Sequence, residues 1–111
     1  MSDTIKFLVQ GSSVEPYQVE FVKNQDKLNA YCNCPAGNKG TYCKHRINIL
    51  NGNSEGIVSN NIEEVQIIRS WLINTELEAI LLEYKEAEQI AETAKKKLSS
   101  VKKKLSKIML K

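Results

Sequence analysis

The chain has 111 residues, of which 41% are apolar and 6% are aromatic, so it can bury one small core but not the core of a large enzyme. The sequence shows neither a charged leader followed by an apolar stretch nor a run of about 20 apolar residues. Three cysteines are an odd number, and unpaired thiols are typical of a reducing compartment. We therefore expect a soluble cytoplasmic protein that makes no membrane contact.

The net charge of +3 is unevenly distributed along the chain. Residues 1–60 contain six basic and five acidic side chains, which sum to +1. Residues 61–92 contain two basic and eight acidic side chains, which sum to −6, and residues 93–111 contain eight lysines and no acid, which sum to +8. A nearly neutral head is thus followed by an acidic and then a basic segment.

The first 32 residues carry the alternating apolar pattern of half-buried strands. The pattern covers residues 5–10, 17–22 and 28–32, and it is interrupted at Gly11-Ser12-Ser13 and at Asn24-Gln25-Asp26. Both interruptions are rich in residues that favour turns. We expect three short antiparallel strands, the third of which ends at Cys32.

All three cysteines and the single histidine fall within one window of fourteen residues. They form two pairs, Cys32-Asn33-Cys34 and Cys43-Lys44-His45, separated by eight residues that include Pro35, Gly37 and Gly40. Pro35 favours a turn, and the glycines let the connection fold back without Cβ clashes. Three thiolates and one imidazole match the tetrahedral preference of Zn²⁺. The spacing predicts one zinc ion per chain, bound by Cys32, Cys34, Cys43 and His45.

The second ligand pair opens a segment of helical spacing, residues 43–50, that ends at Asn51-Gly52. We therefore expect a short helix there. Because four protein ligands leave no position for water or substrate, the predicted zinc is structural and we expect no enzymatic activity. A core of about 60 residues contributes only about 3–5 kcal/mol, whereas zinc in a small module contributes about 10–16 kcal/mol. We expect the head to unfold without metal.

Two alternatives to a zinc site stay open from the residues alone. Free cysteines are often buried as small apolar residues, so the three thiols and the histidine could be ordinary packing residues. The same donors could also hold iron or an iron–sulfur cluster, although three cysteines with one histidine are commoner around zinc.

The motif resembles the SWIM zinc finger. The resemblance rests on Cys-x-Cys followed by Cys-x-His, with Pro35 after the second cysteine, Lys44 between the last two ligands and β-strands before the motif, and it covers about residues 1–52. It implies that the four motif residues bind zinc and that a small sheet is followed by a helix. It also implies a module that contacts nucleic acid or protein.

The next segment is helical in pattern. Asn61-Ile62-Glu63-Glu64 resembles a helix cap, and Val65, Ile68 and Leu72 form an apolar stripe suited to packing on the zinc head. A second helix start at Asn74-Thr75 is predicted by a capping box, but one continuous bent helix is an open alternative.

From Leu77 onward, apolar residues recur with the heptad spacing of a coiled coil. A helix from about Thr75 to Leu110 would be about 54 Å long, too long to pack along the small head. Its apolar stripe therefore needs another helix, and a second copy of the chain is the simplest supplier. We call the ten a and d positions the apolar seam: Leu77, Ile80, Tyr84, Ala87, Ala91, Ala94, Leu98, Val101, Leu105 and Ile108.

Charge order favours an antiparallel pair centred near Thr93. Glu83 then comes near Lys104 and Glu88 near Lys95 or Lys102, whereas a parallel pair stacks like charges. The same order of charges also complements the dipole of a single helix, which is the simpler alternative. Leucine at a with isoleucine at d can favour more than two parallel strands, so the stoichiometry stays open.

Lysines invite a second interpretation, in which the chain binds nucleic acid through phosphate contacts. A solvated charged face is the commoner meaning of lysines beside an apolar seam. The candidate phosphate-binding residues are Lys39, Lys44, Arg46, Lys95, Lys96, Lys102 and Lys103.

The sequence thus predicts an α+β protein with a small antiparallel three-stranded sheet and a short helix around a structural zinc. A connecting helix and a long coiled-coil-forming helix follow, with domain boundaries at residues 1–58, 59–74 and 75–111. We expect a non-catalytic adaptor whose finger contacts an unknown protein and whose C-terminal helix self-associates. The alternative is a small accessory protein that binds DNA through the finger and the lysine-rich helix.

Overall fold

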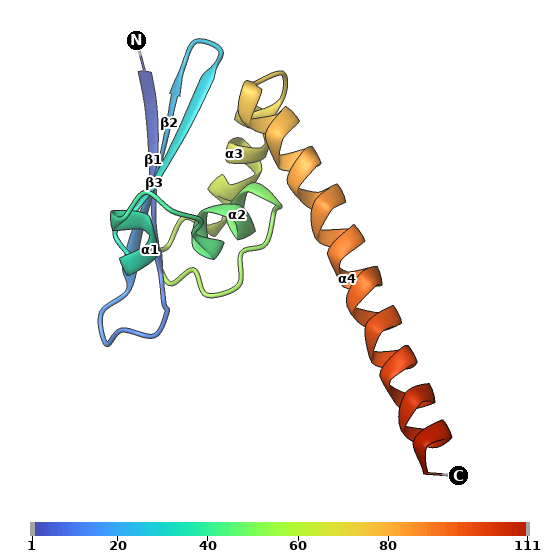
Figure 1. The fold of residues 1–111 in the computed structure, drawn as a ribbon. Coiled ribbons are helices and arrows are strands. Elements are labelled where there is room, and N and C mark those ends of the chain that lie inside the picture. The colour runs from blue at the N-terminus through green and yellow to red at the C-terminus, as the bar shows by residue number, and fades with distance from the viewer. Residues whose placement is uncertain (1, 111) are drawn as a thin grey trace. The chain divides into compact units, whose positions relative to one another are not determined.

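The computed structural model describes residues 2–110 and divides the chain into two compact units, Met1–Glu78 and Ala79–Lys111. Three strands are followed by four α-helices and one 3₁₀ helix, which confirms the predicted α+β class (Figure 1). The elements in chain order are β1 (Ser2–Val9), β2 (Tyr17–Asn24), β3 (Lys27–Cys32), α1 (Pro35–Asn38), α2 (Lys44–Leu50), η1 (Ile62–Glu64), α3 (Val65–Leu72) and α4 (Glu76–Met109).

The sheet has the predicted antiparallel order β1-β2-β3. Phe7 on β1 lies opposite Val19 on β2, and Val19 lies opposite Cys32, the last residue of β3. Cys32 therefore lies beside the central strand of the sheet. The β2–β3 connection is a two-residue turn in which Gln25 adopts a φ of 57°. This alignment delivers Cys32 to the metal site.

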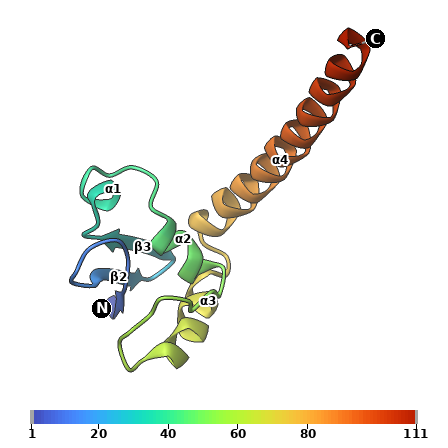
Figure 2. The same cartoon turned by 90° about the horizontal axis from the view of Figure 1, so that it is seen from below.

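One face of the sheet forms the core. Phe7 and Phe21 are buried there and meet edge to face, with ring centroids 6.1 Å apart at 78°. Helices α2 and α3 lie side by side in both Figures 1 and 2, and α2 also contacts β3. The predicted stripe of α3 is buried as expected, with Ile68 fully enclosed.

The outer edge of β1 is covered by a segment that the strand pattern did not predict. Val58 donates its N–H to the Leu8 carbonyl over 2.8 Å, and Gln10 donates to the Gly56 carbonyl over 2.8 Å. Asn61 precedes η1 at the N-cap position, but its Oδ1 accepts from the Ser59 hydroxyl at 2.6 Å and not from a helix N–H. Its amide donates to the Lys6 carbonyl at 2.8 Å. Residues 56–61 therefore satisfy backbone groups that an open sheet edge would leave unpaired.

Helices α3 and α4 are separate, which resolves the alternative of one bent helix. Asn74 has a φ of 64°, a left-handed conformation that interrupts helical geometry. The Thr75 hydroxyl accepts a hydrogen bond from the Glu78 N–H at 3.2 Å and donates to the Leu72 carbonyl at 2.6 Å. The predicted capping residue thus starts α4.

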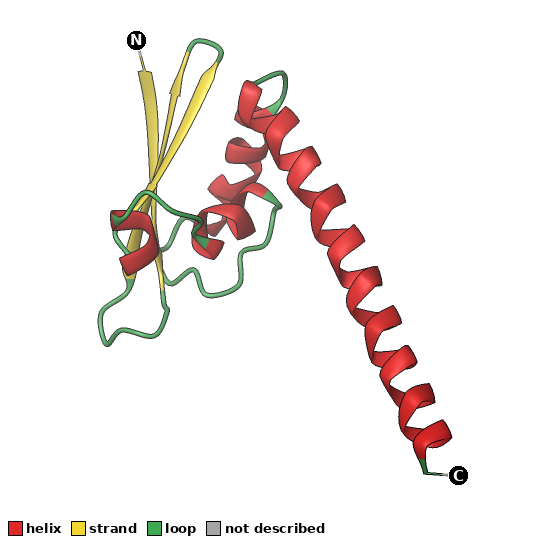
Figure 3. Ribbon diagram, in the orientation of Figure 1, coloured by secondary structure: helices red, strands yellow, loops and turns green. Residues whose placement is uncertain are grey.

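Helix α4 is one unbroken helix of 34 residues, as the secondary-structure colouring of Figure 3 shows. Every residue from Lys85 to Leu110 is exposed in the single chain, including the seam residues Leu98 and Leu105. No helix among residues 2–110 has the length and apolar character needed to cross a membrane.

Candidate metal centre

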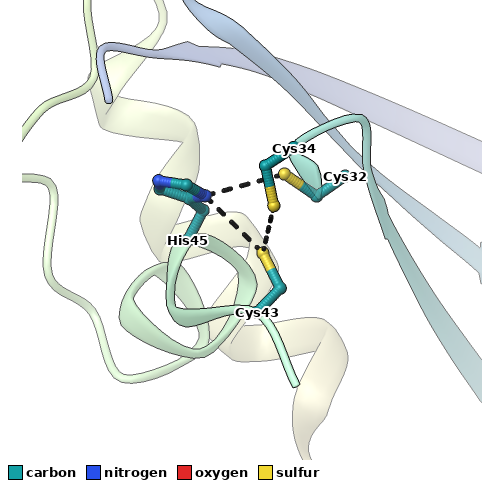
Figure 4. A group of neighbouring side chains, drawn as sticks. All are labelled: Cys32, Cys34, Cys43 and His45. Carbon is teal, nitrogen blue, oxygen red and sulfur yellow. Dashed lines mark hydrogen bonds between the residues drawn. The ribbon is translucent and has the colours of Figure 1, made fainter. Parts of the chain in front are cut away.

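The four predicted ligands converge on one point in the head. Their donor atoms all lie within 4.8 Å of one another, and the side chains point toward a common centre in Figure 4. The three cysteines are buried and unpaired by disulfides, and His45 is half-buried. A cluster of ordinary packing residues would not need to direct four donor atoms inward.

Three of the six distances between donor atoms are close to those of a tetrahedral zinc site. Zn–S bonds of about 2.3 Å and Zn–N bonds of about 2.0–2.1 Å give tetrahedral edges of about 3.8 Å between sulfurs and about 3.6 Å between sulfur and nitrogen. The Sγ atoms of Cys34 and Cys43 are 3.4 Å apart. Nδ1 of His45 lies 3.6 Å from the Cys43 Sγ and 3.8 Å from the Cys32 Sγ. The donor set and its geometry therefore fit Zn²⁺.

Each ligand is positioned by a local structural feature. Cys32 is the last residue of β3, and Cys34 is the N-cap of α1, where its Sγ accepts a hydrogen bond from the Gly37 N–H at 3.3 Å. Cys43 is the N-cap of α2, and His45 is the second residue of that helix. Strand β3 and two helix starts thus meet at the site.

The segment between the ligand pairs is more ordered than a simple turn. Residues 35–38 form the short helix α1, begun by Pro35, whose fixed φ suits the first helical position. The Asn33 side chain accepts a 2.7 Å hydrogen bond from the Gln18 N–H, which fixes the residue between the first two ligands to β2.

Arg46 holds the site together in a way that sequence reasoning missed. Its guanidinium donates to the Ala30 carbonyl at 3.0 Å and to the Thr41 carbonyl at 2.7 Å. Ala30 belongs to β3, and Thr41 belongs to the segment that precedes Cys43. Arg46 therefore joins α2 to both. In the sequence, Arg46 directly follows His45, which is the one local signal of this role, whereas its charge beside the finger predicts a phosphate contact.

Burial and hydrogen bonds set the protonation of the metal-free ligands. Burial raises the pKa of Cys32 to about 12, although a hydrogen bond from the Cys34 backbone opposes the change. Burial also acts on Cys34, but the hydrogen bonds from the Gly37 N–H and the neighbouring thiols outweigh it and lower its pKa. Burial, followed by the charge of Lys44, lowers the pKa of His45, which favours the neutral imidazole that binds metal.

A groove of about 760 Å³ is lined by three of the ligands, Cys34, Cys43 and His45. The rest of its lining comes from the loop after β1, from β2, from α1 and α2, and from residues 55–56. Tyr17 packs against His45 there, with ring centroids 5.2 Å apart. Gly11 permits this contact, because a Cβ atom at that position would lie 2.6 Å from the Tyr17 ring and 3.3 Å from His45 Nε2. Tyr42 and Lys44 form part of the same lining.

The candidate phosphate-binding residues are divided between the two units, three in the first and four in the second. Lys39 and Lys44 are exposed on the finger, whereas Arg46 is held by two backbone carbonyls. The remaining candidates are exposed on α4: Lys95, Lys96, Lys102 and Lys103.

Residues 17–50 match the family model of the SWIM zinc finger. The match includes β2, β3, the two short helices and all four ligands. No curated protein and no solved structure matches the chain. The cluster of three cysteines and one histidine agrees with the family motif, and residues 17–50 of this chain are a SWIM zinc finger.

Proposed function

We propose that the protein is a non-catalytic interaction adaptor, in which one structural zinc ion per chain stabilises a finger that contacts a protein partner. Helix α4 serves self-association. The convergence of Cys32, Cys34, Cys43 and His45 carries the proposal, because these four donors complete a tetrahedral coordination shell. A complete shell has no open position at which zinc could activate water.

A structural role for zinc is supported by the positions of its ligands, which belong to three different secondary-structure elements. Cys32 belongs to β3, Cys34 begins α1, and Cys43 and His45 belong to the start of α2. Bonds from one ion to all four would fix these elements relative to one another. The head is a unit of only 78 residues, so metal binding is expected to supply most of its stability.

A protein partner is supported by the groove beside the zinc ligands. Its lining combines the aromatic rings of Tyr17 and Tyr42 with polar side chains such as Gln10 and Asn48. The charged lining residues Lys44 and Glu55 have opposite signs. A groove with little net charge and several rings suits a peptide segment better than a phosphate backbone.

Binding to nucleic acid is the second candidate, favoured by one observation. Four candidate lysines, Lys95, Lys96, Lys102 and Lys103, are exposed on the C-terminal half of α4, where eight lysines occur without an acid. Such a segment would bind phosphates without sequence preference, and its affinity would fall steeply with salt.

Self-association is supported by the exposure of the apolar seam. Ile80, Leu98 and Leu105 are each more than half exposed in the single chain, at 54%, 55% and 53%. Leaving a continuous row of such side chains in water is unfavourable, and a second helix would bury them.

The experiment is light scattering with metal analysis on the full chain, with and without DNA and RNA oligonucleotides at low and high salt. We expect an oligomer with one zinc per chain, and no binding of either oligonucleotide. Replacing both Leu98 and Leu105 by Asn should give monomers at every concentration, while Leu82→Asn, at an exposed f position, should leave the mass unchanged. Salt-sensitive binding of the oligonucleotides would favour the second candidate, and an unchanged mass for the double variant would contradict self-association through the seam.

A further inference from the structure

Most of the seam of α4 is exposed in the single chain, and among its ten residues Leu77 and Tyr84 are half-buried. Ile80, Leu98 and Leu105 are more than half exposed, and Ile108 is 67% exposed. The seam repeats over the whole length of one straight helical segment, so a covering partner must also be a helix with heptad spacing. A second copy of α4 meets this requirement.

We propose that two copies of α4 pair antiparallel, in one register, about a point between Glu92 and Thr93. The inference rests on the proposed self-association and specifies its direction and partner residues. In an antiparallel coiled coil each a residue packs in a layer with a d residue of the other helix. The layers of the proposed register are Leu77 with the partner's Ile108, Tyr84 with the partner's Val101, Ala91 with the partner's Ala94, Leu98 with the partner's Ala87, and Leu105 with the partner's Ile80.

This register uses the whole seam and balances side-chain size. All five a positions find a d position, so no seam residue is left outside the pair. The small residues Ala91 and Ala94 meet at the centre, where the helices can approach closely. Leu98 then packs with the partner's Ala87, and by symmetry the partner's Leu98 packs with Ala87.

The flanking charges distinguish antiparallel from parallel pairing. Antiparallel helices bring e positions beside e positions and g beside g, so Glu88 meets the partner's Lys95 and Glu83 meets the partner's Lys104. By symmetry each opposite-charge pair forms twice.

Parallel helices bring each g position beside the next e position of the partner instead. Glu83 then meets the partner's Glu88, and Lys97 meets the partner's Lys102, again twice each. The antiparallel arrangement thus has four pairs of opposite charge, whereas the parallel arrangement has four pairs of like charge.

The dipole of a single helix does not explain these charges. Its effect is confined to the first and last turns of a helix. Glu88 and Lys95 lie near the middle of α4, more than two turns from either end. The position of these charges beside the seam is therefore better explained by a neighbouring helix.

The proposed direction has a consequence for the fingers. The first residue of α4, Glu76, lies beside the last turn of the partner helix, so the two chains enter the pair from opposite ends. A helix of 34 residues is about 51 Å long. The two fingers would therefore be attached to the paired helices at opposite ends.

The test uses the full-length zinc-loaded protein and the double variant Lys95→Glu with Lys104→Glu. In the antiparallel register this variant creates four pairs of glutamates, so we expect its dissociation constant to rise at least tenfold in sedimentation equilibrium. In a parallel pair the same positions face the partner's Ile90 and the partner's Met109, so the constant would barely change.

The matched control is Lys96→Glu with Lys103→Glu, which changes the net charge equally at f positions away from the seam. We expect it to dimerise like the unmodified chain, with unchanged zinc content and helical circular dichroism in both variants. Mixing the Lys95→Glu, Lys104→Glu chain with a Glu83→Lys, Glu88→Lys chain should restore association as a heterodimer.

The outcomes separate the two proposals. An unmodified chain that is monomeric at all concentrations contradicts self-association itself, and with it the register. A dimer that tolerates the Lys95→Glu, Lys104→Glu change, or that is weakened equally by the control, overturns the antiparallel register while leaving self-association standing.

Discussion

Gly37 lies against the main-chain carbonyl of Cys32 so closely that a Cβ atom at position 37 would overlap the carbonyl oxygen. The same glycine donates its N–H to the Cys34 Sγ at 3.3 Å. Its need for glycine comes from close approach, because Gly37 lies in helix α1 and has no positive φ. One residue that binds no metal thus holds two of the four ligands in place.

Gly37→Ala should damage the metal site. The added methyl group must push the Cys32 backbone away, at a cost of about 1–3 kcal/mol for overpacking, and the shift would separate Cys32 from Cys34. We expect weaker zinc binding in a competition titration with a chromophoric chelator, together with a lower unfolding temperature.

Gly40→Ala is the matched control. A Cβ atom at Gly40 meets open space, although its φ of 71° makes alanine strained there. It should lower stability by about 1 kcal/mol and leave the zinc affinity close to that of the unmodified chain. Equal affinities for the two alanine variants would show that contact between Gly37 and Cys32 does not position the ligands.

Zinc affinity should rise with pH. Burial raises the pKa of Cys32 from 9.0 to about 12 in the metal-free head, so at neutral pH this thiol must lose its proton when zinc binds. Each proton released makes binding about tenfold stronger per pH unit. Competition titrations between about pH 6.5 and 8 measure the slope, and a flat profile would contradict thiolate coordination by Cys32.

Arg46→Ala should destabilise the finger. The substitution removes the hydrogen bonds to Ala30 and Thr41 and leaves both carbonyls without this donor. Hydrogen bonds to a charged group contribute about 1.5–3 kcal/mol each when buried, so a total near 2 kcal/mol is expected for this half-buried side chain. Lys39→Ala, at an exposed position, should change thermal stability by less than about 0.5 kcal/mol. Similar unfolding temperatures for the two variants would argue against the structural role of Arg46.

The sequence predicted well those features that depend on residues close together along the chain. Cys32, Cys34, Cys43 and His45 share one short window, so their spacing alone indicated that they meet. Strand alternation and the Thr75 capping box are likewise local patterns, and the structure shows both the strands and the helix start.

The features that sequence did not predict depend on contacts between distant residues. Asn61 stands at the start of a helix as the sequence predicts, but its side chain also bonds to the Lys6 carbonyl, 55 residues away, which no local pattern reveals. Arg46 looked like a phosphate ligand, because nothing local revealed that the Ala30 carbonyl lies within its reach. Periodicity also left open whether α3 and α4 were one helix, which the backbone of Asn74 decides.

Metal analysis of the purified chain, joined to NMR of the head before and after a strong chelator, measures whether zinc gives residues 2–78 their fold. We predict one zinc ion per chain and the collapse of the dispersed amide signals of β1, β2 and β3 when the ion is removed, with recovery on adding zinc back. A chain without stoichiometric metal, whose strand signals stay dispersed in the chelator, would contradict a structural zinc site at Cys32, Cys34, Cys43 and His45.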